Sequence, residues 1–230
     1  MVFGNKQHCG NLTPNIFINN EKLDIVHSTT FLGLILDSKL SWKPQIGSIT
    51  KKVAKVIGIL TRAKQFLNKK TLIQLYFSFA YPYLIYGNII WGSAPSSTLW
   101  PLFKIQKIII RIICNIRKRN STQNEFKNLK ILRVPDIHRF SLCLFMFKYE
   151  KNLLPTCLNN LFRYNRDVHT HNTRNRNNLR QPKTHTNLAE LFITNLGPKY
   201  WNNLDGHIDK SLSLACFKKN LIQKIIKEYG

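Results

Sequence analysis

Hydrophobic and polar positions divide the chain into a short β-rich beginning and a long helical remainder. Asn15 to Ile18 and Glu21 to Ile25 are rich in β-forming residues, and Asn19-Asn20 between them is typical of a turn. These segments predict a hairpin. Thr29 to Leu36 is also rich in β-formers and predicts one further strand.

After Pro44 the apolar spacing becomes that of a helix. The apolar positions on one predicted face are Ile46, Ile49, Val53, Val56, Ile57, Leu60 and Leu67. Lys51, Lys55 and Arg62 share another face. The pattern predicts a long amphipathic helix with one cationic side.

A segment without charged residues follows, covering positions 71–103. Within it, Leu72 to Trp91 is long enough to cross a bilayer, which makes a membrane protein one alternative for this chain. Gln74, Pro82 and Asn88 interrupt the segment, and its tyrosines lie in the middle, whereas membrane spans carry them at the ends. We therefore favour a buried helix pair kinked at proline, and no membrane partner.

A second amphipathic helix follows. Its predicted apolar stripe is Ile105, Ile108, Ile109, Ile112, Ile113 and Ile116. Lys104, Lys107, Arg111 and Lys118 are predicted to lie opposite that stripe.

Two more helices are predicted towards the C-terminus. The first runs from about Pro135 to Lys151, with these residues inside: Leu142, Leu144, Phe145 and Phe147. The second begins after Ser213, which can cap it, and its inward positions are Leu214, Phe217, Leu221 and Ile225. Its lysines, predicted to face water, are Lys218, Lys219, Lys224 and Lys227.

Residues 163–187 differ from their surroundings because arginine and asparagine dominate and few apolar residues are available for burial. This composition predicts an extended or mobile loop and a linker. Arg174, Arg176 and Arg180 are its candidate contacts to RNA or DNA, and a merely solvated linker is the alternative.

Charge changes the picture of function most. The 230 residues include 35 Lys and Arg against 11 Asp and Glu, a formal net charge of +24, which favours a strongly polyanionic partner. The five cysteines are widely spaced without a C-x-x-C motif, and the first residues do not resemble a signal peptide. We expect a protein of the nucleus and cytoplasm that is not secreted.

The order of short motifs along the chain resembles the C-terminal third of reverse transcriptases of non-LTR retrotransposons, of the LINE-like and jockey-like kind. The motifs are Phe31-Leu32-Gly33 with Asp37 and Leu40-Ser41-Trp42; Leu75-Tyr76; Pro82-Tyr83-Leu84-Ile85-Tyr86-Gly87 with Trp91-Gly92; Gln106-Lys107 with Arg111; Leu144-Phe145-Met146-Phe147-Lys148; His171-Asn172-Thr173-Arg174; Leu179 with Pro182 and Thr186; Gly197 with Trp201-Asn202-Asn203-Leu204; and Phe217-Lys218. Two positions depart from the pattern: Gln45, where the family often has histidine, and Asp205, where it has proline.

The resemblance implies a mainly α fold with a small β-hairpin or strand remnant of a polymerase palm. It divides the chain into a palm remnant (1–42), thumb-like helices (43–118), a helical region (119–162), the basic loop (163–187) and a terminal helical segment (188–230). It also implies that Phe31, Leu32 and Gly33 form the primer grip beside the primer end. The alternative is that Phe31 and Leu32 are core residues and Gly33 is a bulge.

In such polymerases, palm aspartates, including an Asp-Asp pair, hold two Mg²⁺ ions. No Asp-Asp pair exists in this chain, and two-metal chemistry needs clustered carboxylates. We expect the parent protein to be an enzyme and this chain alone to have no catalytic residues, no metal and no cofactor. Its expected partners are a template–primer duplex or RNA–DNA hybrid, the element RNA, and the palm, fingers and endonuclease regions of a longer polyprotein.

Other chemistry fits less well. Cys143, Cys157, His169 and His171 lack the spacing of a zinc site, and the segment 205–209 is more typical of a helix cap than of a cation site. Nothing local activates a cysteine nucleophile.

The candidate contacts to nucleic acid are Lys51, Lys52, Lys55, Arg62, Lys104, Lys107, Arg111, Lys118, Arg174, Arg176 and Arg180. For each of them, a purely solvated side chain is the alternative. The rival to a polymerase fragment is a free-standing basic RNA-binding protein, either domesticated or the remnant of a decayed element.

Overall fold

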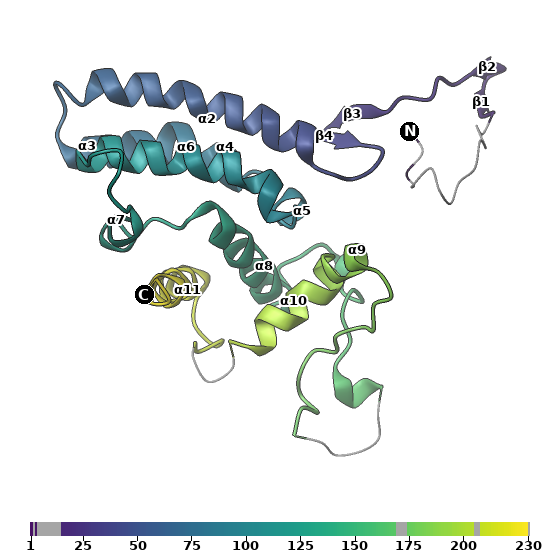
Figure 1. Ribbon diagram of the computed structural model, residues 1–230. Helices are drawn as coiled ribbons and strands as arrows, with labels where there is room; N and C mark the ends of the chain where they lie inside the picture. Colours follow the sequence, from purple (N-terminus) through teal and green to yellow (C-terminus); the bar gives the residue numbers. More distant parts are fainter. Residues whose placement is uncertain (2, 4–14, 169–173, 205–207, 230) are drawn as a thin grey trace.

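The computed structural model describes residues 1, 3, 15–168, 174–204 and 208–229. The protein is mainly helical, with 56% helix and 7% strand, as the sequence predicted (Figure 1). The elements in order are β1 (Phe17–Ile18), β2 (Glu21–Lys22), β3 (Ser28–Phe31), β4 (Leu34–Asp37), α2 (Lys43–Ala63), α3 (Lys69–Leu75), the π-helix η1 (Tyr76–Ala80), α4 (Tyr81–Ile85), α5 (Asn88–Trp91), α6 (Ser96–Cys114), α7 (Gln123–Asn128), α8 (Val134–Glu150), the 3₁₀ helices η2 (Thr156–Leu158) and η3 (Asn165–Asp167), α9 (Asn187–Glu190), α10 (Ile193–Asn202) and α11 (Leu214–Lys227).

Two antiparallel hairpins precede the helices. β1 pairs with β2 across Asn19-Asn20, as predicted. The prediction of a single strand over 29–36 is wrong, because the chain turns at Leu32-Gly33 and β3 pairs with β4, with Phe31 opposite Leu34. Both turn residues have positive φ, 48° at Leu32 and 76° at Gly33, as the tight turn of a two-residue hairpin requires. Figure 1 shows β1 and β2 projecting away from the helices.

The long helices α2 and α6 lie side by side and run in the same direction (Figure 1). At their C-terminal ends, Lys64 Nζ donates a hydrogen bond to Asn115 Oδ1 at 2.8 Å. At their N-terminal ends, Lys43 of α2 and Ser97 of α6 line one groove. Val53 and Leu60 of α2 are fully buried, as the apolar spacing predicted, whereas Leu67 lies beyond the helix and is exposed.

The apolar stripe predicted for α6 needs correction. The buried side chains of α6 are Leu99, Leu102, Gln106, Ile109, Ile110 and Ile113. Ile108 is exposed, and Ile116 and Lys118 lie beyond the helix, which ends at Cys114 before Asn115 in the left-handed conformation. Isoleucine occurs on every side of this helix, so apolar spacing did not identify the buried face.

The uncharged segment is broken into α3, η1, α4 and α5, and Tyr76, Leu84 and Trp91 are fully buried. Proline removes a backbone donor, and Pro82 lies in the first turn of α4, directly after the π-helix. The segment therefore has more than the two predicted helical pieces, and an irregular π-helical turn precedes Pro82. Within the described residues, no helix has the length and apolar character needed to cross a membrane.

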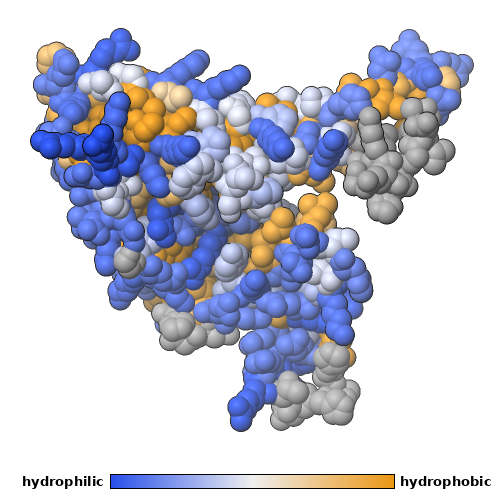
Figure 2. Space-filling view, in the orientation of Figure 1, coloured by the Kyte–Doolittle hydropathy of each residue, from blue (hydrophilic) through white to orange (hydrophobic). Residues whose placement is uncertain are grey.

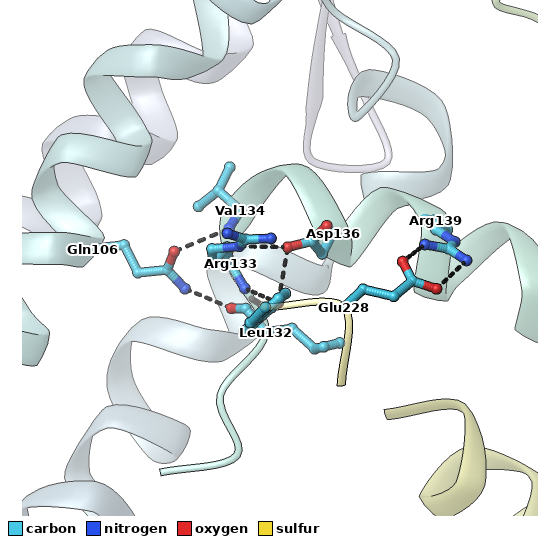
Figure 3. Close-up of polar contacts among 8 residues, drawn as sticks. Gln106, Leu132, Arg133, Val134, Asp136, Arg139 and Glu228 are labelled. Carbon is cyan, nitrogen blue, oxygen red and sulfur yellow. Dashed lines mark hydrogen bonds and ion pairs between the residues drawn. The ribbon is translucent and has the colours of Figure 1, made fainter. Parts of the chain in front are cut away.

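A polar network joins α6 to the C-terminal helices (Figure 3). The side chain of Gln106 accepts a hydrogen bond from Val134 N at 2.9 Å and donates to Leu132 O at 2.9 Å. Nearby, Arg133 Nε donates to Asp136 Oδ2 at 2.8 Å. Buried residues from Leu34 to Tyr229 form one core cluster, so Leu34 beside the turn of the β3–β4 hairpin and the C-terminal helices pack into the same interior.

The terminal helix agrees with its prediction. Ser213 caps α11 through a hydrogen bond from Cys216 N, and Phe217 and Leu221 are fully buried. Helix α8 also agrees, since it covers Val134–Glu150 and buries Leu142 and Phe147.

The basic loop is more ordered than predicted in its described part. Tyr164 forms an isolated antiparallel β-bridge with Leu179, which is buried. The side chain of Asn202 in α10 donates to Leu179 O at 2.8 Å and accepts from Leu179 N at 3.1 Å. The prediction of a plain extended or mobile linker over 163–187 is therefore wrong for residues around this bridge, because a side chain distant in sequence fixes the backbone.

Candidate nucleic-acid interface

The outer face of α2 carries the first set of predicted cations. The exposed side chains there are Lys51, Lys52, Lys55 and Arg62. Lys52 Nζ lies 5.6 Å from the ring centre of Tyr83 in α4, so the cationic face reaches an exposed aromatic side chain of the neighbouring helix. In Figure 2, hydrophilic side chains line the outer edge of α2.

No carboxylate balances these charges within the same stretch of sequence. From Ser38 to Asn124 the chain has 15 Lys and Arg and neither Asp nor Glu. Among the described residues, the ion pairs are Arg133 with Asp136, Arg139 with Glu228, and Arg166 with Asp167, all outside that stretch. The body formed by α2 to α6 therefore contains no acid of its own. Outside it, Glu125 of α7 lies beside Cys114 together with Lys69.

Helix α6 carries the second set of cations, which lies around an exposed tryptophan. Trp100 is 46% exposed, and Lys107 Nζ lies 4.7 Å and Lys104 Nζ 5.7 Å from its ring centre. Partial burial lowers the pKa of Lys107, and the positive charges of Arg111 and Arg133 lower it further. The structure thus brings Lys104, Lys107 and Arg111 close together, beside an aromatic surface.

A groove separates the N-terminal halves of α2 and α6. It has a volume of about 420 Å³ and is lined by Lys43, Ile46, Gly47, Thr50, Ser97, Thr98 and Pro101. Lys51 follows Gly47 by four residues and Lys104 follows Pro101 by three, so each lies on its helix beside a groove residue. The two predicted cationic helices therefore flank one concave surface.

Lys118 departs from this arrangement. It was predicted on the same helix face as Arg111, but it lies in the turn after α6. Arg111 reaches towards that turn, where its NH2 group donates to Asn120 O at 3.2 Å.

The predicted primer-grip residues form the tip of the β3–β4 hairpin. Phe31 is 63% and Leu32 74% exposed, so neither is a core residue, and Gly33 is a turn residue and not a bulge. Tyr86 Oη donates to Leu32 O at 2.6 Å, and a Cβ at Gly87 would lie 2.7 Å from the side chain of Leu34. Residues of two motifs that are 54 positions apart in sequence, Leu32 and Tyr86, thus meet in space.

Asp37 fixes the connection between this hairpin and α2. Its carboxylate accepts hydrogen bonds from Ser41 N at 3.0 Å and Trp42 N at 3.1 Å. Partial burial alone would raise the pKa of Asp37, but the hydrogen bonds from Ser41 and Trp42 outweigh it, and the pKa is lowered. Gln45 Oε1 accepts from Ile35 N at 2.9 Å and ties β4 to α2.

The arginines of the basic loop lie elsewhere. Arg174 and Arg176 are exposed and Arg180 is half-buried, on a loop that Figure 1 shows at the opposite side of the molecule from α2. The structure therefore does not join them with the lysines of α2 and α6.

The described part of the chain does not bring a set of metal ligands together, and burial shields the thiols of Cys114 and Cys143 to different degrees. No group of three His, Cys, Asp or Glu side chains there could hold a metal ion. Burial raises the pKa of Cys114 to about 11 and that of Cys143 to about 12, so both thiols stay protonated. His169, His171 and residues 205–207 lie outside the described residues.

Trp100 and the groove residues were not predicted. The sequence does hold a signal for Trp100, because Lys104 and Lys107 follow it at helical spacings of four and seven residues. No short sequence motif predicts the groove, because it is formed by the packing of α2 against α6.

No protein-family model, curated protein or solved structure matches this chain.

Proposed function

We propose that this chain is the template–primer-gripping part of an RNA-directed DNA polymerase of the non-LTR retrotransposon kind. It contacts the duplex through the lysine and arginine faces of α2 and α6. The observation that carries the proposal is a stretch with 15 cations and no carboxylate, which contains two parallel cationic helices that flank a groove.

Sequence-independent contact with phosphates suits this surface. Flexible lysines such as Lys51 and Lys55 neutralise backbone charge without reading bases, and each neutralised phosphate releases counterions. Affinity should therefore fall steeply with salt and depend little on sequence. The hairpin tip at Phe31 to Gly33 remains the proposed primer grip.

The chain does not supply the chemistry of polymerisation in this proposal. The carboxylates and two Mg²⁺ ions would belong to a palm carried by the parent protein. The rival function is that of a free-standing RNA-binding protein. Equal affinities for single-stranded RNA and for an RNA–DNA hybrid would favour this rival.

A pair of triple variants tests the proposed surface. One combines Lys51→Gln, Lys52→Gln and Lys55→Gln on α2. The matched control combines Lys218→Gln, Lys219→Gln and Lys227→Gln, three exposed positions of α11. Both variants lose the same formal charge, so a general effect of net charge is equal in the two.

The measurement is fluorescence anisotropy with an RNA–DNA hybrid, a DNA duplex and a single strand over a salt series. For the hybrid, we expect the α2 variant to reduce the log–log salt slope by about 2–3, and the α11 variant to leave it near the wild-type value. Equal slopes for both variants would contradict the proposed interface. Failure of the wild type to bind any of the three probes near physiological salt would contradict the function itself.

A further inference from the structure

A second cationic site lies far from α2, between the basic loop and α10. It is a pocket of about 540 Å³, and its lining includes Arg163, Arg180 and Lys183. No acidic side chain lines it, and none of these three cations takes part in an ion pair found among the described residues. The volume is that of a small-molecule site, which commonly measures roughly 300–1,000 Å³.

The backbone holds two of these arginines opposite each other. Arg180 N donates to Arg163 O at 2.8 Å, directly beside the bridge between Tyr164 and Leu179. Residues paired in this way have side chains on the same face, with Cβ atoms about 5 Å apart. The two arginine side chains therefore leave the backbone on the same face, and both line the pocket.

Like charges placed directly opposite each other destabilise a strand pair. This pairing cannot relax by sliding, because Asn202 clamps both backbone groups of Leu179. The arrangement thus concentrates positive charge at the pocket wall, and an anion bound between the guanidinium groups would remove the repulsion.

The other walls suggest what the anion belongs to. Leu161, Phe162 and Pro182 give the pocket apolar sides, and Thr194 of α10 supplies a hydroxyl. Arginine forks pair with phosphate oxygens, and a phosphate monoester carries about −1.5 to −2 charges near pH 7, against one for an internal phosphodiester. Three cations match the monoester better, and the apolar sides can accept a sugar or base.

We infer that this pocket binds the phosphate monoester of a nucleotide, either free or at the end of a strand, between Arg163 and Arg180. The site is separate from the α2–α6 surface, and binding of a free nucleotide does not depend on the function proposed above.

The test uses the full chain and three probes: adenosine 5′-monophosphate, inorganic phosphate, and one oligonucleotide with either a 5′-phosphate or a 5′-hydroxyl. The variant is Arg180→Gln. The matched control is Lys199→Gln, which removes the same charge from an exposed position of α10 that does not line the pocket. Calorimetry measures the two small ligands, and anisotropy measures the oligonucleotides.

We expect the wild type and Lys199→Gln to bind the nucleotide more tightly than inorganic phosphate, and Arg180→Gln to bind the nucleotide at least tenfold more weakly than the wild type does. Preference for the 5′-phosphorylated strand would identify a strand end as the source, and equal binding of both strands would identify the free nucleotide. Thermal unfolding without ligand separates a ligand-binding role of Arg180 from a purely structural one. The melting temperature of Arg180→Gln should be no lower than that of the wild type, because the substitution removes the repulsion between Arg163 and Arg180.

Three results would overturn the inference: no binding of the nucleotide by the wild type, equal affinities of the wild type and Arg180→Gln, or tighter binding of inorganic phosphate than of the nucleotide. Loss of duplex binding by the α2 triple variant, with nucleotide binding unchanged, would show that the two sites are independent.

Discussion

The α2–α6 body and the C-terminal region use charge in different ways. In the C-terminal region, two arginines pair with acids: Arg133 with Asp136, and Arg139 with Glu228 in a two-pronged contact between α8 and the residue after α11 (Figure 3). The α2–α6 body contains no acid of its own, and the cations of α2 lie on its surface. The Arg139–Glu228 pair joins α8 to the end of α11, whereas the cations of α2 take part in no ion pair found among the described residues, which leaves them available to a partner.

The largest expected effect on stability comes from removing the hydrogen bonds of Gln106, which join the α2–α6 body to the C-terminal region. Gln106 is fully buried, and its amide also donates to Tyr76 Oη at 2.9 Å. Gln106→Leu leaves Val134 N, Leu132 O and Tyr76 Oη without their partner, and each such buried group costs about 1–3 kcal/mol. We expect the free energy of unfolding to fall by about 3 kcal/mol, measured by chemical denaturation.

The control for this change is Lys104→Gln, an exposed position on the same helix, expected to shift stability by less than about 0.5 kcal/mol. A fall of similar size in both variants would mean that the Gln106 network does not couple the regions.

A smaller effect is expected at Trp100, where a substitution should weaken nucleic-acid binding without changing the stability of the α2–α6 body. Stacking of a base on an exposed aromatic ring contributes about 1–3 kcal/mol, so Trp100→Ala should weaken single-strand binding about tenfold. Trp100→Phe should retain most of the affinity, and neither variant should change the melting temperature by more than a few degrees. Anisotropy with single-stranded and blunt duplex probes measures this, and an equal loss for both probes would argue against stacking.

The smallest effect concerns Asp37, the last carboxylate before the stretch without acids. Asp37→Asn weakens the hydrogen bonds to Ser41 N and Trp42 N, a loss of about 1 kcal/mol by comparison with helix-cap substitutions. The lowered pKa means that this stabilisation is present above pH 3.8 and is lost as the pH falls through the folded-state value.

The difference in unfolding free energy between the wild type and Asp37→Asn should therefore be present at pH 6 and shrink below pH 3.8. A difference that stays constant over this range would show that the carboxylate charge does not hold the turn.

Sequence patterns predicted α2 and α11 well because each helix has one narrow apolar face and a sharply different opposite face. They failed at Leu32-Gly33, because a bulky residue in the left-handed conformation carries none of the usual turn signals. They failed at Gln106 because its partners, Leu132 and Val134, lie 26 and 28 residues away.

The same distinction applies to the candidate sites. Helical spacing located the cations of α2 and α6, since it placed Lys51, Lys55 and Arg62 on one predicted helix and Lys104, Lys107 and Arg111 on another. The groove between these helices and the opposed pair Arg163 and Arg180 were not predictable, because tertiary packing and a backbone pairing fixed by Asn202 create them. Lys118 shows the converse, since the helical pattern continued past the residue where α6 ends.

The parallel direction of α2 and α6 constrains how the chain can fold and vary. Two antiparallel helices can close through a short turn, but here residues 64–95 must carry the chain back along the whole of α2, which is ~32 Å long at 1.5 Å per residue for its 21 residues. The contacts between α2 and α6 therefore join residues far apart in sequence, and they can form only after residues 64–95 have folded back along α2. A deletion within α3 to α5 would make this segment too short to span the length of α2. The segment should therefore tolerate substitutions far better than deletions.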